Sequence, residues 1–180
     1  MQARKSIRAT VQIALSVAFL CVSAMISVPF LGIPFTLQSF AVFAVLGLLG
    51  WRRGGVATLV YLMLGAVGLP VFSGFTGGLG VLFGHSGGFL FGFLLAVPVY
   101  AVFAWLGKGK RIFVALGMVA GLLVSYLSGA LWYYFLFAAD TSLGTVLSVC
   151  ILPFLLPDAI KLSLALLVTE RMKKHPIFSS

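Results

Sequence analysis

The sequence predicts an all-α membrane protein with six transmembrane helices, and its composition and charge pattern carry that prediction. Of the 180 residues, 62 % are hydrophobic and 8 % are charged, and the mean hydropathy is +1.20. No soluble domain of this length could bury so much apolar surface. The net charge of +9 comes from short basic clusters between apolar runs, which is typical of membrane topology signals and not of a nucleic-acid-binding surface. We therefore expect one integral membrane domain over residues 1–180.

The first span is predicted at about 9–30, after a basic start that contains Arg4, Lys5 and Arg8. A basic start before an apolar run also resembles a secretory signal peptide. An uncleaved helix is favoured because the run is long enough to cross a bilayer. Removal of this segment would also leave an odd number of spans.

The second and third spans, predicted at about 35–50 and 56–69, are short. The sequence WRRGG at 51–55 is expected to form a basic turn between them. At a rise of 1.5 Å per residue, a span of sixteen residues extends only about 24 Å, whereas the hydrocarbon core is ~30 Å thick. Helices that stop early are expected to leave a cavity beside the segment that follows them.

That following segment, residues 70–88, contains seven glycines in nineteen residues. Each glycine costs roughly 1 kcal/mol relative to Ala in a helix interior, so a plain helix is disfavoured. Non-helical backbone at membrane depth persists only where it is buried in protein or lines a cavity. We therefore expect a Gly-rich loop between helices 3 and 4 that closes a small-molecule pocket.

The fourth and fifth spans are predicted at about 88–106 and 112–137. The last apolar stretch contains Pro153 and Pro157 and allows two interpretations. It forms either one helix kinked at both prolines, or a short non-spanning helix at 142–152 followed by a span at about 157–172. The second interpretation is favoured because proline is preferred at the first helical position. Asp158 would then lie in the first turn, where the helix dipole favours a carboxylate.

With six spans, every basic cluster falls on one side of the membrane. Eleven of the twelve Lys and Arg residues lie at 4–8, 52–53, 108–111 and 171–174, and the opposite loops hold none. The positive-inside rule then predicts an N-in, C-in topology. The Gly-rich loop is accordingly expected to be extracellular.

The twelfth basic residue, Lys161, follows Asp158 by three positions and lies on the same helix face. Ionisable residues at membrane depth are costly and usually functional. The two side chains either neutralise each other to fix the helix, or anchor a ligand that has N–H donors and a carbonyl or carboxylate. Ligand anchoring is favoured because this is the sole opposite-charge pair of the sequence outside the terminal clusters.

Other groups are weaker candidates for ligand binding. Gln38 can donate and accept, but its amide can equally form an interhelical hydrogen bond. The Gly-rich loop can offer backbone N–H groups to a ligand. His85 has no second metal ligand nearby, so a rim hydrogen bond or exposure to solvent is expected and no metal site is predicted. The sequence lacks G-x-x-x-x-G-K-[ST], so no ATP hydrolysis is expected of this chain.

Four motifs in combination resemble the BioY family, the biotin-specific S components of energy-coupling factor (ECF) transporters. They are IPFTLQ at 33–38, GLPVFSGFTGG at 68–78, GHSGGFL at 84–90, and PF at 153–154 followed by Asp158 and Lys161. The resemblance covers nearly the whole chain. The family usually reads Gly-Pro-Thr-Gly-Gly where this chain has GHSGG, a departure that affects the loop conformation and the contacts at the pocket rim.

The resemblance implies a bacterial-type, multi-pass protein of the plasma membrane that binds biotin from outside and has neither a cofactor nor an enzymatic activity. It also implies docking on a transmembrane T component with two ATPase subunits, through the A-x-x-x-A motif of helix one, here Ala14 and Ala18. A subunit for another vitamin and a purely structural membrane subunit are the alternatives.

The biotin-binding residues expected from the sequence and this resemblance are Asp158, Lys161, Gln38, Phe72, Ser73, Gly74, Thr76, Gly77 and Gly78, with His85 and Trp132 as possible rim residues. Asp158 would accept from the ureido N–H groups, and Lys161 would donate to the ureido carbonyl or else pair with the valerate carboxylate. Gln38 and the backbone N–H groups of 73–78 are the other candidates for that carboxylate.

Overall fold

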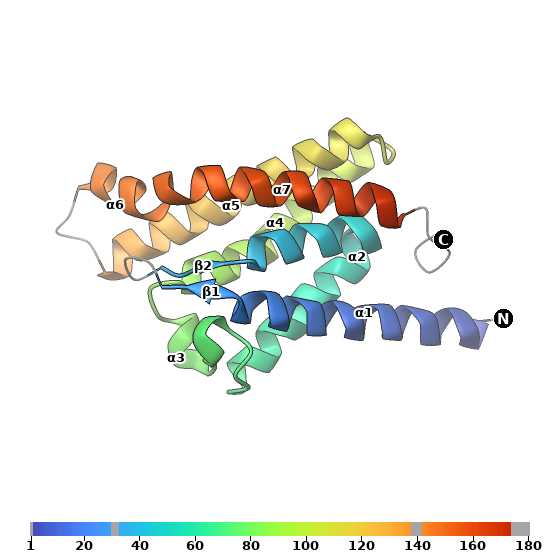
Figure 1. Cartoon of the computed structure of the whole chain (residues 1–180), viewed down its shortest axis with the longest axis horizontal. Coiled ribbons are helices and arrows are strands. Elements are labelled where there is room, and N and C mark those ends of the chain that lie inside the picture. Colours follow the sequence, from blue (N-terminus) through green and yellow to red (C-terminus); the bar gives the residue numbers. More distant parts are fainter. Residues whose placement is uncertain (1, 30–32, 138–141, 174–180) are drawn as a thin grey trace.

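Long helices lie side by side in the computed structural model, which describes residues 2–29, 33–137 and 142–173 (Figure 1). Five helices among these residues are long and apolar enough to span a membrane. The helices are α1 (Gln2–Met25), α2 (Gln38–Ala66), α3 (Leu79–Leu82), α4 (Gly87–Leu106), α5 (Arg111–Phe137), α6 (Leu143–Cys150) and α7 (Leu152–Met172). The short α6 and α7 together form the fifth candidate span, and α3 is a single turn.

α2 is a hairpin of two helical arms, because Gly50 has a φ of 74° and a ψ of 171° that no helix contains. Gln38 Nε2 donates to Tyr61 Oη at 2.6 Å, although a straight helix would separate two residues 23 positions apart by about 35 Å. The arms, 38–49 and 51–66, therefore run antiparallel, as Figure 1 shows. The described residues thus make six passes through the bundle, as the sequence predicts.

The expected basic turn at 51–55 is wrong in its placement. Residues 51–55 are helical, and the reversal is made at Gly50 alone. Only glycine readily takes this backbone conformation, so one residue is sufficient where the sequence suggested a five-residue turn.

The first connection is not purely helical. Strands β1 (Ser27–Val28) and β2 (Phe35–Thr36) pair antiparallel, with Ser27 opposite Thr36. α1 consequently ends at Met25 and α2 begins at Gln38, inside the limits expected for the first two spans. This small hairpin departs from an all-α chain, and it places the segment before Gln38 against the end of α1.

The Gly-rich loop folds back over the end of the bundle opposite both termini (Figure 1). It contains a 3₁₀ turn at Ser73–Phe75 and the short α3. Gly74 and Gly78 have φ angles of 68° and 94°, which a residue with a side chain rarely adopts. The density of glycine noted in the sequence therefore serves a tight non-helical path.

The last helix begins earlier than expected. The short helix α6 forms as predicted, but α7 starts at Leu152, so Pro153 occupies the first turn and Pro157 lies inside the helix. Either proline suits a first turn, and the sequence could not rank them. Asp158 therefore lies about two turns into α7 and not in its first turn, so the helix dipole contributes less to it than predicted.

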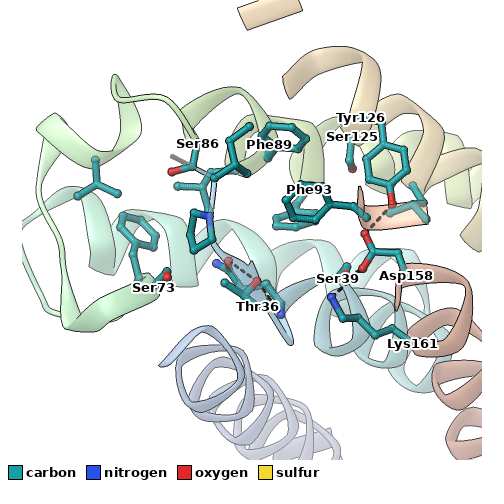
Figure 2. A pocket seen from close by; sticks show the side chains of 18 of the residues that line it. Thr36, Ser39, Ser73, Ser86, Phe89, Phe93, Ser125, Tyr126, Asp158 and Lys161 are labelled. Carbon is teal, nitrogen blue, oxygen red and sulfur yellow. Dashed lines mark hydrogen bonds and ion pairs between the residues drawn. The ribbon is translucent and has the colours of Figure 1, made fainter. Parts of the chain in front are cut away.

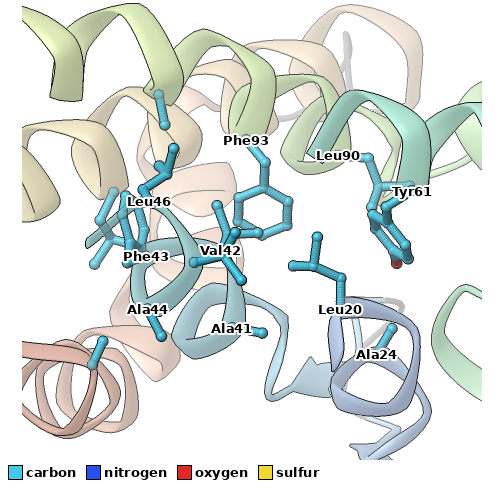
Figure 3. Packing of buried hydrophobic residues seen from close by; sticks show 14 of the residues in the cluster. Leu20, Ala24, Ala41, Val42, Phe43, Ala44, Leu46, Tyr61, Leu90 and Phe93 are labelled. Carbon is cyan, nitrogen blue, oxygen red and sulfur yellow. The ribbon is translucent and has the colours of Figure 1, made fainter. Parts of the chain in front are cut away.

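The core is centred on the first arm of α2. Every residue from Ala41 to Leu46 is buried, as expected for a helix that is apolar all round. Figure 3 shows these side chains meeting Leu20 and Ala24 of α1 and Phe93 of α4. A buried central arm gives the pocket beside it a rigid wall.

Candidate ligand-binding site

A cavity of about 140 Å³ lies between the Gly-rich loop, β2, α2, α4, α5 and α7. Its lining combines aromatic and aliphatic side chains with a few hydroxyl, amide and charged groups, which is the usual make-up of a small-molecule site. The lining residues are Ile33, Pro34, Thr36, Gln38, Ser39, Phe72, Ser73, Thr76, Val81, Ser86, Phe89, Leu90, Phe93, Leu122, Ser125, Tyr126, Phe154, Asp158 and Lys161.

Asp158 is the polar centre of this cavity and is only 4 % exposed. Its Oδ1 accepts from Ser39 Oγ at 2.7 Å and from Lys161 Nζ at 2.8 Å. Its Oδ2 accepts from Tyr126 Oη at 2.7 Å. The carboxylate is thus held by α2, α5 and its own helix α7, and a buried charge of this kind is stable only when it is paired and hydrogen-bonded.

Lys161 lies at the edge of the same cavity, with 12 % of its side chain exposed. Its Nζ is 6.0 Å from the centroid of the Phe35 ring, which itself stacks on Phe154 at 4.4 Å. A cation over an aromatic face is attracted to it. The ammonium is therefore fixed between a carboxylate and an aromatic pair, with one side toward the cavity.

Polar groups gather at both ends of the cavity and rings lie between them (Figure 2). Asp158 and Lys161 mark one end, Ser73 and Ser86 the other, and Phe89 and Phe93 lie in the middle. This arrangement suits an elongated ligand with an apolar centre and a hydrogen-bonding group at each end.

Gln38 lines the cavity, but its amide is already engaged. Thr36 Oγ1 donates to Gln38 Oε1 at 3.0 Å, and Gln38 Nε2 donates to the buried Tyr61 hydroxyl. The interhelical hydrogen bond that the sequence left open is therefore present. Gln38 links β2 to the second arm of α2, and its second amide hydrogen is still available to a ligand.

The Gly-rich loop contributes side chains to the cavity more than backbone. Phe72 is 1 % exposed, lines the cavity and packs edge-on against Tyr61. Ser73 and Thr76 line the cavity as well, whereas Gly74, Gly77 and Gly78 do not. The Gly78 N–H donates to the Gly65 carbonyl at 2.7 Å, so this expected donor is occupied within the chain.

The two expected rim residues lie outside the lining. His85 is exposed and its ring stacks on Phe137 at 4.1 Å. Trp132 Nε1 donates to the Gly84 carbonyl, and its side chain covers Gly88. Both hold the Gly-rich loop against α5, which is a supporting position and not a contact with the cavity.

Several lining residues were not expected from the sequence, above all Ser39, Tyr126 and Phe93. Ser39 and Tyr126 lie 119 and 32 positions from Asp158, and neither has a spacing that indicates the contact. The one available signal was the presence of polar side chains, Ser125 and Tyr126, in the middle of a predicted span.

On α1, Ala14 and Ala18 are exposed, so this small-residue pair faces outward from the bundle. Among the described residues, no group of three or more His, Cys, Asp or Glu side chains is placed to hold a metal ion.

The fold and the cavity define a multi-pass membrane protein whose helix bundle contains a cavity of small-molecule type. A family model described as the BioY family matches residues 1–176, and the chain belongs to this family. The chain is 37 % identical to the probable biotin transporter BioY of Pyrococcus horikoshii, over 89 % of this chain and 93 % of that protein. It is 41 % identical to the biotin transporter BioY of Thermotoga maritima, over 87 % and 90 % of the two chains.

The fold is similar to a crystal structure of the S component for biotin from an ECF-type ABC transporter. The TM-score is 0.88 and the sequence identity 25 %, and the match covers 99 % of this chain and 97 % of the other.

Proposed function

We propose that this chain is the biotin-binding, substrate-capture subunit of an ECF-type vitamin uptake transporter in the plasma membrane. The observation that carries the proposal is the buried Asp158 at one end of an elongated cavity, paired with Lys161 and two hydroxyl donors. Membership of the BioY family and the names of its relatives support biotin as the ligand. The family is one of transporter subunits, so no catalytic step is assigned to the chain.

The ureido ring of biotin suits the Asp158 end of the cavity, because it carries two N–H donors and one carbonyl. A carboxylate offers about four acceptor positions, and Oδ2 uses one of its two for Tyr126. The free position on Oδ2 accepts a ureido N–H, and Lys161 donates to the ureido carbonyl. An analogue without the ureido group would forfeit these charge-assisted bonds and is expected to bind far more weakly.

The valerate carboxylate then lies at the opposite end, near the hydroxyl groups of Ser73, Thr76 and Ser86. Its chain passes Phe89 and Phe93, whose rings exclude water from the middle of the cavity. Gln38 contributes its second amide hydrogen. Gly74, Gly77 and Gly78 allow the backbone of the Gly-rich loop to follow its non-helical path, and they do not contact the ligand directly.

Calorimetric titration of the detergent-purified chain with biotin tests the proposal. Asp158→Asn removes the charge and one acceptor, and we expect at least a tenfold loss of affinity because the ureido donor loses its partner. Glu170→Gln is the matched control, since Glu170 is a second carboxylate of α7, is paired with Arg111, and does not line the cavity. Unchanged affinity in Asp158→Asn would contradict the assigned role.

A competition panel of other vitamins separates biotin from the alternative ligands. Displacement of labelled biotin by a different vitamin at lower concentration would assign the cavity to that vitamin. Absence of any bound vitamin in native mass spectrometry would instead favour a structural subunit.

The exposed pair Ala14 and Ala18 is the proposed docking surface for the T component, which in turn holds two ATPase subunits. Small side chains allow a partner helix to approach closely, so Ala18→Trp is expected to abolish co-purification with the T component while biotin binding persists. Leu123→Trp, which also places a tryptophan side chain at an exposed position but on α5, is the control. Recovery of the intact complex with Ala18→Trp would argue for a different docking face.

A further inference from the structure

A second, apolar groove runs along α1 between that helix, the first arm of α2 and the end of α7. It is lined by Ile7, Arg8, Val11, Gln12, Leu15, Ser16, Phe19, Ala44, Val45, Leu48, Val168 and Met172. Its volume is about 570 Å³, several times that of the ligand cavity, and it is open to the surface of the bundle. None of its lining residues lines the ligand cavity.

The length of the groove matches one leaflet of a bilayer. From Ile7 to Phe19 it follows α1 over twelve residue-to-residue steps, about 18 Å at a rise of 1.5 Å each. Half of a ~30 Å hydrocarbon core is about 15 Å. An extended acyl chain therefore fits along the groove with its polar end at Ile7 and Arg8.

A basic pocket adjoins the groove at this same end. Arg53 and Lys173 are the charged residues of the described chain that line it. It shares the lining residues Gln12 and Leu48 with the groove, so the two spaces lie side by side. Arg53 Nη1 donates to Gln12 Oε1 at 2.9 Å, which holds the guanidinium at the junction.

The length of the apolar groove and the basic pocket at its end together indicate the chemistry of the molecule that binds there. We propose that the groove and the adjoining basic pocket form a binding site for one anionic phospholipid. Its acyl chain lies in the groove, and its phosphate-bearing headgroup lies among Arg8, Arg53 and Lys173. The proposal goes beyond biotin capture, because no residue that lines the groove or the basic pocket also lines the cavity around Asp158.

Native mass spectrometry of the full chain, titrated with phosphatidylglycerol or phosphatidylcholine in neutral detergent, tests the proposal. We expect phosphatidylglycerol adducts at lower lipid concentration than phosphatidylcholine adducts. Arg53→Gln is expected to weaken phosphatidylglycerol binding roughly fivefold, the usual contribution of one basic residue near a lipid headgroup. Lys173→Gln should act in the same direction, and either variant suffices if the other fails to fold.

Arg52→Gln is the matched control, since Arg52 carries the same charge next to Arg53, lies over the Trp51 ring, and lines neither space. It should retain phosphatidylglycerol with an unchanged thermal unfolding temperature. Ser16→Phe, which fills the groove, should weaken the binding of both lipids.

Three results would overturn the proposal. Equal affinity for the two lipids in the unaltered chain would show no preference for an anionic headgroup. Equal losses in Arg52→Gln and Arg53→Gln would show a general charge effect. Displacement of the lipid by glycerol phosphate at the lipid's own concentration would show a small-anion site in which the groove has no part.

Discussion

Asp158 depends on donors from three different positions in the chain, and this dependence explains how a carboxylate persists at membrane depth. Ser39, Tyr126 and Lys161 each donate to it within 2.8 Å. A donor lost from such a network leaves a buried acceptor unpaired, and that penalty exceeds the net worth of an ordinary hydrogen bond.

Tyr126→Phe removes the donor to Oδ2 without changing the shape of the cavity wall. We expect the free energy of unfolding to fall by about 1–3 kcal/mol and biotin to bind more weakly, because the carboxylate is no longer held in place. Thermal unfolding and calorimetric titration measure the two effects. Tyr134→Phe, a neighbour on α5 outside the lining, should change neither quantity. A Tyr126→Phe chain that matches the control in both measurements would refute the positioning role.

At this scale the sequence predicted the charged pair and missed its partners. Asp158 and Lys161 are conspicuous because charges are rare in apolar spans. A serine or a tyrosine in such a span has too many ordinary roles to indicate a binding site. Its use here depends on which helices lie beside α7, and the local sequence does not contain that information.

Among the elements, the Gly-rich loop is packed against the second arm of α2 by the Phe72 ring. The Phe72 side chain fills a notch at Gly65, where an added Cβ would overlap the ring. The same ring contacts Tyr61, which holds Gln38. The loop, the second arm of α2 and the segment before the first arm are therefore fixed to one another at the cavity.

Gly65→Ala is expected to displace Phe72 and with it the wall of the cavity. Overpacking of this kind costs about 1–3 kcal/mol, so the chain should unfold at lower temperature and biotin should bind at least several-fold more weakly. Gly80→Ala is the control, because nothing lies within 4 Å of a Cβ added there. Should Gly65→Ala and Gly80→Ala bind biotin equally well, the Phe72 notch would not determine the cavity.

Element positions could be predicted where apolar runs are long and basic clusters separate them. Element ends could not, as the start of α7 at Leu152 and the reversal at Gly50 show. Both depend on which of several prolines or glycines the packed bundle uses, and that choice is made by neighbouring helices.

For the whole molecule, the even number of passes brings both described ends of the chain to one end of the bundle (Figure 1). The basic clusters at Arg52 and at 108–111 are predicted to share that side. The proposed N-in, C-in orientation follows from the positive-inside rule and would place the Gly-rich loop outside the cell.

Labelling with a membrane-impermeant thiol reagent checks this orientation. In a chain without Cys21 and Cys150, Phe75→Cys on the exposed part of the loop should react in intact cells. Lys110→Cys, also exposed, should react only after the membrane is permeabilised. The opposite pattern would mean that the chain is inserted the other way round.

The sequence by itself determined the membrane class, the six passes, the family resemblance and the Asp158–Lys161 pair. These follow from composition, the lengths of apolar runs and local spacing, all of which depend only on the order of residues along the chain. The tertiary structure alone decided that Ser39 and Tyr126 hold Asp158, that Trp132 supports the loop from outside the cavity, and that a basic pocket lies beside an apolar groove. The physical reason is that each of these contacts joins helices far apart in sequence, and their packing sets the distances.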